Sequence, residues 1–150
     1  MDERFNLQRF IDAQEPVYPA VVAELQRGKK SGHWMWFIYP QISGLGHSAM
    51  ARHYAIRSIE EARAYLVHSV LGERLIHCTR LVNDVAGCTA MQIFGYPDDR
   101  KFRSSMTLFE RADNHVPVFA QALAKYFDGV PDPLTLDILR QQDHADGKEG

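Results

Sequence analysis

Apolar residues recur at helical spacing between positions 71 and 85, and this periodicity is the strongest constraint on the fold. Steps of four, three, four and three residues separate the members of the stripe, which are Leu71, Leu75, Cys78, Val82 and Val85. Such spacing places all of them on one face of an α-helix. We therefore expect a central core helix here, ended by Gly87.

Other segments also have helical signals. Ser58 and Glu61 have the spacing of a capping box, in which the hydroxyl accepts the Glu61 N–H and the carboxylate bonds back to the Ser58 N–H. Phe102, Met106 and Phe109 recur at i, i+4 and i+7, which predicts a helix over about residues 99–112. The stretch 34–39 is too short and too uniformly apolar to assign, so its local structure stays open.

These patterns predict an all-α fold. No pair of alternating strands flanks a two-residue turn, and no low-complexity linker interrupts the middle of the chain. We expect a single compact domain of about seven or eight helices over residues 1–140. From Gln141 the chain is polar and contains glycine, which predicts a disordered C-terminal tail over residues 141–150.

Composition excludes several classes of protein. The chain has 150 residues, of which 45% are hydrophobic and 24% charged, as in an ordinary globular domain. A net charge of −2 argues against a general nucleic-acid binder, because such domains are usually basic. No apolar run reaches the ~18 residues of a membrane span, so we expect a cytoplasmic protein with no membrane partner. The sequence leaves the oligomeric state open.

The cysteines and histidines give no metal or disulfide signal. Cys78 and Cys88 stand apart from any Cys-x-x-Cys or His-x-x-x-His partner, and the seven histidines are scattered. We therefore expect no metal site and no cofactor. Phosphate-loop, nucleophile-elbow and dinucleotide-binding motifs are also missing.

Residues 28–41 are the first candidate for a binding site, because they combine both tryptophans with cations. A flat ring could stack on an indole while a lysine neutralises a phosphate or carboxylate. His33 is the candidate catalytic acid or base. The alternative is that the aromatic residues form core while the lysines suit a helix C-terminus. The candidate ligand-binding residues here are Lys29, Lys30, His33, Trp34, Trp36 and Gln41.

A second candidate is the turn Gly44-Leu45-Gly46-His47-Ser48. Its glycines precede a predicted helix N-terminus capped by Ser48, where free N–H groups can bind an anion. Gly46 and Ser48 are the candidate binding residues. Glycine-rich turns before helices are common, so an ordinary loop is the alternative.

The third candidate lies within the helix predicted over residues 99–112. Lys101 precedes three hydroxyl residues, Ser104, Ser105 and Thr107, although serine and threonine are not favoured inside helices. If they face the Trp34 region, they add hydroxyl donors to the site. The alternative is that they bond to carbonyl groups one turn earlier.

A family resemblance is carried by residues 28–41, 44–48, 54–56, 61–62 with 65–66, 71–75 and 101–109. These segments resemble the bacterial family called domain of unknown function 1810, which is sometimes mislabelled calpastatin. The resemblance implies a single, mainly α-helical domain and supplies no activity. A calpastatin label implies a disordered inhibitor, which this folded composition opposes.

Two hypotheses of function follow. The first is a small-molecule site for a nucleotide or another phosphorylated ligand, in a binding protein or in an enzyme such as a hydrolase or N-glycosidase. The second is a non-catalytic interaction module, in which Trp34, Trp36, Phe37 and Tyr39 form an exposed aromatic patch. A concave pocket favours the first hypothesis and a flat exposed face the second.

Overall fold

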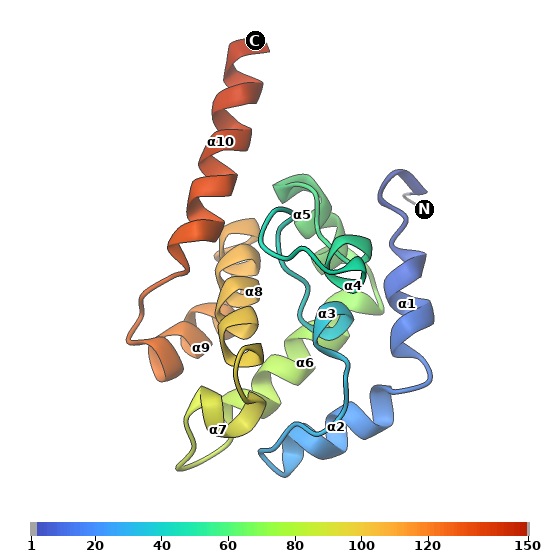
Figure 1. The fold of residues 1–150 in the computed structure, drawn as a ribbon, viewed down its shortest axis with the longest axis vertical. Helices are drawn as coiled ribbons and strands as arrows, with labels where there is room; N and C mark the ends of the chain where they lie inside the picture. The colour runs from blue at the N-terminus through green and yellow to red at the C-terminus, as the bar shows by residue number, and fades with distance from the viewer. Residues whose placement is uncertain (1–2, 150) are drawn as a thin grey trace.

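The computed structural model describes residues 3–149, with side chains over residues 4–144. Within these residues it has ten α-helices, one 3₁₀ helix and no strand (Figure 1). In chain order the elements are η1 Glu3–Phe5, α1 Gln8–Gln14, α2 Tyr18–Gln26, α3 Met35–Ile38, α4 Ala49–His53, α5 Ile59–Val67, α6 Leu71–Asn83, α7 Ala90–Phe94, α8 Asp98–Ala112, α9 Pro117–Phe127 and α10 Pro133–Glu149.

The all-α class is confirmed, and the predicted count of seven or eight helices is wrong. The described chain has more helices because it uses several of about one turn, namely α3, α4 and α7. Four or five residues are too few to show a helical period in the sequence. The unassigned stretch around Trp36 is one of these, the four-residue helix α3.

Helices α6 and α8 form the centre of the domain. α6 packs against α2, α5 and α9, while α8 packs against α5, α7, α9 and α10. The predicted stripe on α6 is buried at Leu71, Leu75, Cys78 and Val82. The helix ends at Asn83, before the expected stop at Gly87, so Val85 lies beyond it.

The predicted capping box of α5 is only half formed. Ser58 accepts the Glu61 N–H as expected, at 3.2 Å. The Glu61 carboxylate instead accepts the Arg57 N–H and pairs with Arg9 at 2.9 Å. Both side chains of that ion pair are almost fully buried, and Arg9 also donates to the carbonyl groups of Phe5, Asn6, His53 and Ala55. The Glu61 carboxylate, which was predicted to complete the cap of α5, therefore links α5 to α1 through its ion pair with Arg9.

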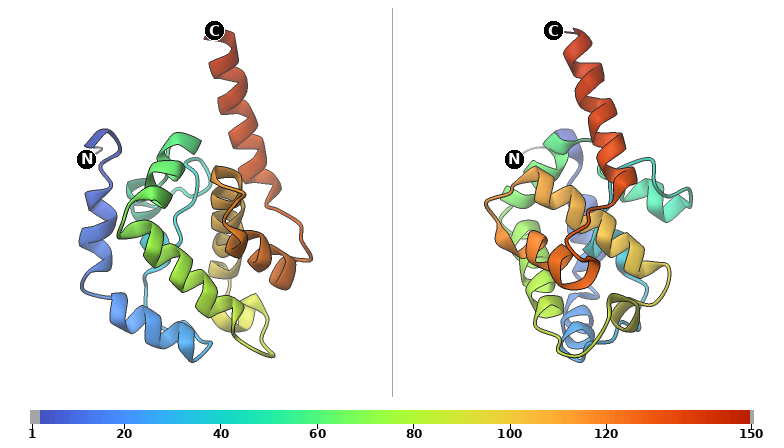
Figure 2. Two further views of the ribbon diagram at one scale, coloured as in Figure 1. Left: turned by 180° about the vertical axis from the view of Figure 1, so that it is seen from behind. Right: turned by 90° about the vertical axis from the view of Figure 1, so that its left-hand side faces the viewer.

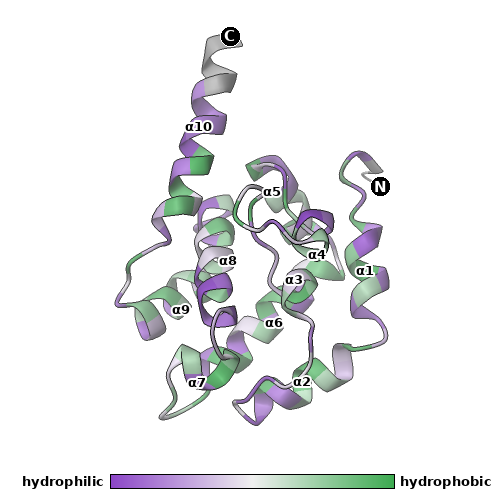
Figure 3. Ribbon diagram, in the orientation of Figure 1, coloured by the Kyte–Doolittle hydropathy of each residue, from purple (hydrophilic) through white to green (hydrophobic). Residues whose placement is uncertain are grey.

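The first part of α10 packs against α8, and its C-terminal end projects beyond the rest of the domain (Figures 1 and 2). The sequence predicts a disordered tail from Gln141, whereas the structure continues the helix to Glu149. Beyond Leu139 the part of α10 coloured by hydropathy is hydrophilic (Figure 3). Disorder of this segment in solution stays a prediction.

No helix within residues 3–149 combines the length and the apolar character needed to cross a bilayer.

Candidate functional site

The two tryptophans of the first candidate segment have different environments. Trp34 is only 2% exposed, and its indole N–H donates to the Glu24 carboxylate at 2.9 Å. Phe37 and Tyr39 are buried as well. The prediction of an exposed aromatic patch is therefore wrong for Trp34, Phe37 and Tyr39, which belong to the core. Of the predicted patch, Trp36 alone is half-buried.

Glu24 fixes the loop that leads to Trp34. The same carboxylate oxygen, Oε1, accepts the N–H of Ser31 at 2.7 Å and that of Gly32 at 2.9 Å. Burial acts to raise the pKa of Glu24, but the hydrogen bonds from Gly32, Ser31 and Trp34 together lower it. This buried carboxylate is thus stabilised in its charged form by the loop that it holds.

The cationic residues of the first segment do not form one site. The Lys30 ammonium group pairs with Asp98 at 2.9 Å, donates to the Gly32 carbonyl oxygen and lies 5.0 Å from the centroid of the Trp34 ring. Its side chain is only 7% exposed, and the Asp98 carboxylate already balances its positive charge. Lys29 and His33 are exposed and line none of the cavities described here. The predicted ligand roles of Lys29, Lys30, Trp34 and His33 are not supported.

A cavity of about 580 Å³ lies between the start of α8, the loop before α4 and the segment that joins α9 to α10. We call it the Trp36 cavity. It brings together members of all three candidate segments: Trp36, Gln41, Gly46, Ser48, Lys101 and Ser104. The other lining residues are Leu45, His47, Ala51, Pro97, Arg100, Arg103, Asp132 and Leu134.

Within the Trp36 cavity, Lys101 lies over the aromatic face of Trp36. The Lys101 nitrogen lies 5.3 Å from the centroid of the Trp36 ring and 3.2 Å from an oxygen of Asp98. Asp98 therefore pairs with Lys101 and with the buried Lys30 at once. This shared carboxylate joins the first segment to the start of α8.

Two backbone hydrogen bonds join the segment before α4 to Ile56, which follows α4. The Ser43 N–H donates to the Ile56 carbonyl oxygen at 2.7 Å, and the Ile56 N–H donates to that of Gln41 at 2.9 Å. A Cβ on Gly46 would lie only 2.6 Å from the Cβ of Ala51, so a side chain there would push α4 outward. Ser48 caps α4 as predicted, accepting the Ala51 N–H at 3.1 Å. Gly46 and Ser48 thus shape a wall of the cavity.

A smaller hollow of about 70 Å³ adjoins this wall. It shares Trp36, Gln41, Gly46 and Ala51 with the Trp36 cavity and extends toward Tyr54. Trp36 therefore has open space in two adjoining hollows.

The hydroxyl groups of α8 are used mainly within the fold. Ser104 lies within hydrogen-bond distance of the Arg100 carbonyl oxygen and of Asp132, and Thr107 donates to the Arg103 carbonyl oxygen. Bonding to the preceding turn therefore accounts for Thr107, while the single hydroxyl hydrogen of Ser104 has two acceptors, of which Asp132 is the nearer at 2.8 Å. Ser105 and Thr107 are buried and do not line the Trp36 cavity, so their predicted ligand roles are not supported.

Sequence reasoning missed the two arginines of the cavity. Arg100 lies over the ring of Tyr96 at 4.9 Å, and Arg103 donates to the carbonyl oxygens of Val130 and Pro131 at 3.0 Å each. With Lys101 they give three cations against one lining carboxylate, Asp132. The sequence signal that could have identified them is the run Arg100-Lys101-Phe102-Arg103. Phe102 is buried, so the three charged residues around it fall on the outer side of the helix, where they can line a cavity.

Nothing in the described chain groups three or more histidine, cysteine or acidic side chains as a metal site would. Cys78 is buried, which raises the pKa of its thiol to about 12, whereas Cys88 is half-buried. The titratable groups that line the Trp36 cavity, apart from its cations, are His47 and Asp132.

Comparison with known proteins supplies a family and no activity. No curated protein matches the chain significantly. A solved structure, that of the conserved hypothetical protein Rv1873 from Mycobacterium tuberculosis, is similar with a TM-score of 0.90 and 53% sequence identity. The match covers 91% of this chain and 98% of the other. Residues 4–139 match the family described as protein of unknown function (DUF1810), and the chain belongs to that family.

Proposed function

We propose that the Trp36 cavity binds a small anionic ligand that contains a flat ring, such as a nucleotide or another phosphorylated compound. The observation that carries the proposal is that the half-buried Trp36 ring, with Lys101 over it, lines one cavity together with Arg100. Its volume of about 580 Å³ lies within the range of about 300–1,000 Å³ typical of small-molecule sites.

Each part of the cavity suits one part of such a ligand. The indole of Trp36 offers a face for stacking a base or another flat ring. Arg100 and Lys101 offer charged donors for a phosphate, and a guanidinium group can bind two of its oxygens at once. Gln41 adds an amide that can donate or accept. Arg103 is held by two backbone carbonyl groups, so it contributes charge more than free donors.

The proposal is one of binding, and we assign no chemical step. His47 and Asp132 are the lining groups that could move a proton. Asp132 already accepts hydrogen bonds from Ser104 and Thr135, which commits one of its oxygens to the fold. The predicted catalytic role of His33 finds no support, since His33 does not line the cavity.

The test is a thermal-shift and calorimetric titration with nucleoside mono- and diphosphates, ADP-ribose and sugar phosphates. A ligand of the cavity raises the melting temperature by an amount that grows as its concentration increases above its dissociation constant. Lys101→Met removes the charge but keeps most of the aliphatic chain, and Asp98 retains Lys30 as its partner. We expect this variant to weaken binding about tenfold, as for the loss of one charge-assisted hydrogen bond.

Lys29→Met is the matched control, because Lys29 is exposed and lies outside the cavity. It should bind the same ligand as tightly as the unmodified protein does. A panel in which no compound shifts the melting temperature, or a ligand weakened equally by both variants, contradicts the proposal.

A further inference from the structure

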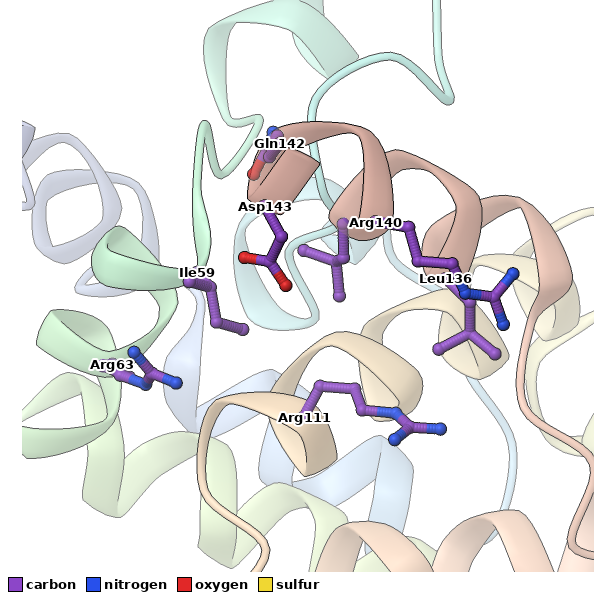
Figure 4. A pocket seen from close by; sticks show the side chains of 8 residues that line it. Ile59, Arg63, Arg111, Leu136, Arg140, Gln142 and Asp143 are labelled. Carbon is purple, nitrogen blue, oxygen red and sulfur yellow. The ribbon is translucent and has the colours of Figure 1, made fainter. Parts of the chain in front are cut away.

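A second cavity lies where α10 passes over α5 and the end of α8 (Figure 4). We call it the arginine cavity. Its volume is about 260 Å³, and it shares no lining residue with the Trp36 cavity. The residues that line it are Ile59, Arg63, Arg111, Leu136, Leu139, Arg140, Gln142 and Asp143.

Its charge is predominantly positive. Arg63 comes from α5, Arg111 from α8 and Arg140 from α10, so three helices each contribute a guanidinium group. Asp143 is the single carboxylate among the lining residues. Carboxylates outside the cavity, Asp137 beside Arg140 and Glu110 beside Arg111, balance part of this charge, and the arginine of each pair is exposed, so these carboxylates compete only weakly with a bound anion.

Most hydrogen-bond donors of these arginines are not used within the fold. Arg63 donates through Nε to the carbonyl oxygen of Ala112 at 3.2 Å. Arg140 bonds to Asp137 at 3.2 Å, and Arg111 lies 3.6 Å from Glu110. Within the described residues the three groups make no other bond, although each guanidinium carries five N–H donors. These donors are available for an oxyanion.

The rest of the lining is apolar. Ile59, Leu136 and Leu139 are half-buried side chains from α5 and α10. A free inorganic ion would leave this surface in contact with water, whereas an organic anion can cover it. A volume of about 260 Å³ falls just below the usual range for drug-sized ligands, so the apolar part must be short.

We propose that the arginine cavity binds a small organic anion, with its acidic group among Arg63, Arg111 and Arg140 and its apolar body against Ile59, Leu136 and Leu139. Aromatic carboxylates and aryl phosphates share this chemistry. The inference does not rest on the function proposed for the Trp36 cavity.

Asp143 gives the proposal a distinctive feature. In Figure 4 its carboxylate points into the cavity, so the protein places an anion of its own beside the arginines. The neighbouring Gln142 donates to the carbonyl oxygen of Arg57 at 2.9 Å and holds this turn of α10 against the domain. A bound anion must therefore compete with the negative charge of Asp143, and neutralising that charge should tighten binding.

The test uses benzoate and phenyl phosphate as probes, with benzyl alcohol as the uncharged comparison, and follows backbone amide signals by NMR. We expect saturable shifts for α5, α8 and α10 residues with both anions and none with the alcohol. Arg111→Gln should weaken benzoate binding by about threefold to tenfold, since this exposed side chain loses a charge-assisted bond. Asp143→Asn should tighten it by about threefold.

Arg80→Gln is the matched control, because Arg80 is an exposed arginine of α6 outside both cavities. Mapping the shifts also separates the two sites: those of the arginine cavity lie around Arg63, Arg111 and Arg140, whereas those of the Trp36 cavity lie around Trp36, Gly46 and the start of α8. Three results would each overturn the proposal. Benzyl alcohol could bind as tightly as benzoate, Arg111→Gln and Arg80→Gln could weaken benzoate binding equally, or Asp143→Asn could leave the affinity for benzoate unchanged. The same holds if neither anion gives a saturable shift at these helices.

Discussion

Trp34 and Trp36 have different environments although they are only two positions apart. Trp34 is the residue before α3 and does not have helical backbone angles, whereas Trp36 lies inside the helix. The Trp34 ring lies in the core against Glu24, and the Trp36 ring lines a cavity. Each ring meets a different lysine: Lys30 lies over Trp34 in the core, and Lys101 lies over Trp36 in the cavity, so the two indoles do not form one site.

For a single residue, Glu24, we predict a contribution to stability that depends on pH. Its folded-state pKa is lowered, so the carboxylate stabilises the fold fully above its unfolded pKa of about 4.3 and loses that contribution as the pH falls through its folded pKa. Glu24→Gln lacks the charge at every pH. We expect the variant to be less stable by about 1–3 kcal/mol at pH 7. Urea unfolding at pH 7 and pH 3 should show the gap between the two proteins shrinking in acid.

Glu110→Gln serves as the comparison, because Glu110 makes only a 3.6 Å ion pair with Arg111. Its stability should change by less than about 0.5 kcal/mol. A gap between Glu24→Gln and the unmodified protein that is the same at both pH values would show that the loop does not hold the charged form.

At the scale of elements, hydroxyl groups of α8 anchor the start of α10. Thr107 accepts the Asp132 N–H at 2.9 Å, and Ser104 contacts the Asp132 carboxylate at 2.8 Å. Asp132 in turn caps α10, accepting the N–H and the hydroxyl of Thr135. The unusual serine and threonine content of α8 thus positions a helix that contributes to both cavities.

Thr107→Val tests this anchor, since valine keeps the shape but removes the hydroxyl. The partly buried Asp132 N–H then lacks its partner, which should lower the free energy of unfolding by about 1–2 kcal/mol. Hydrogen exchange at Asp132 should become faster at the same time.

Ser105→Ala is the matched control from the same buried helix. Among the described residues its hydroxyl has no hydrogen-bond partner, so its removal should cost clearly less than Thr107→Val does. Equal destabilisation by the two variants would contradict the anchoring role.

At the scale of the whole molecule, the sequence predicts the helices better than it predicts the site. The stripe from Leu71 to Val82 depends on local periodicity, which the fold preserves. The Trp36 cavity depends instead on the meeting of α3, the loop after Gln41, α8 and the Asp132 segment, and no local pattern encodes that meeting. Trp36, Gln41, Gly46, Ser48, Lys101 and Ser104 were identified by residue type, and the structure brings them to one surface.

The misses have physical reasons. Lys30 looked like a ligand group, but its partner Asp98 is far away in the sequence. Glu61 looked like a cap because the Arg9 that it binds belongs to another helix. Arg100 and Arg103 were missed because charged residues on the outer face of a helix usually have no function beyond solvation.

Fluorescence titration of the protein and of Trp36→Phe tests the central claim most directly, using the ligand that most raises the melting temperature. Trp34 is buried against Glu24, so Trp36 is the indole in reach of a ligand. The account predicts saturable quenching in the unmodified protein and its loss in Trp36→Phe, whose phenyl ring still supports binding by calorimetry. Quenching that persists undiminished without Trp36, or binding that leaves its emission unchanged, would contradict the account.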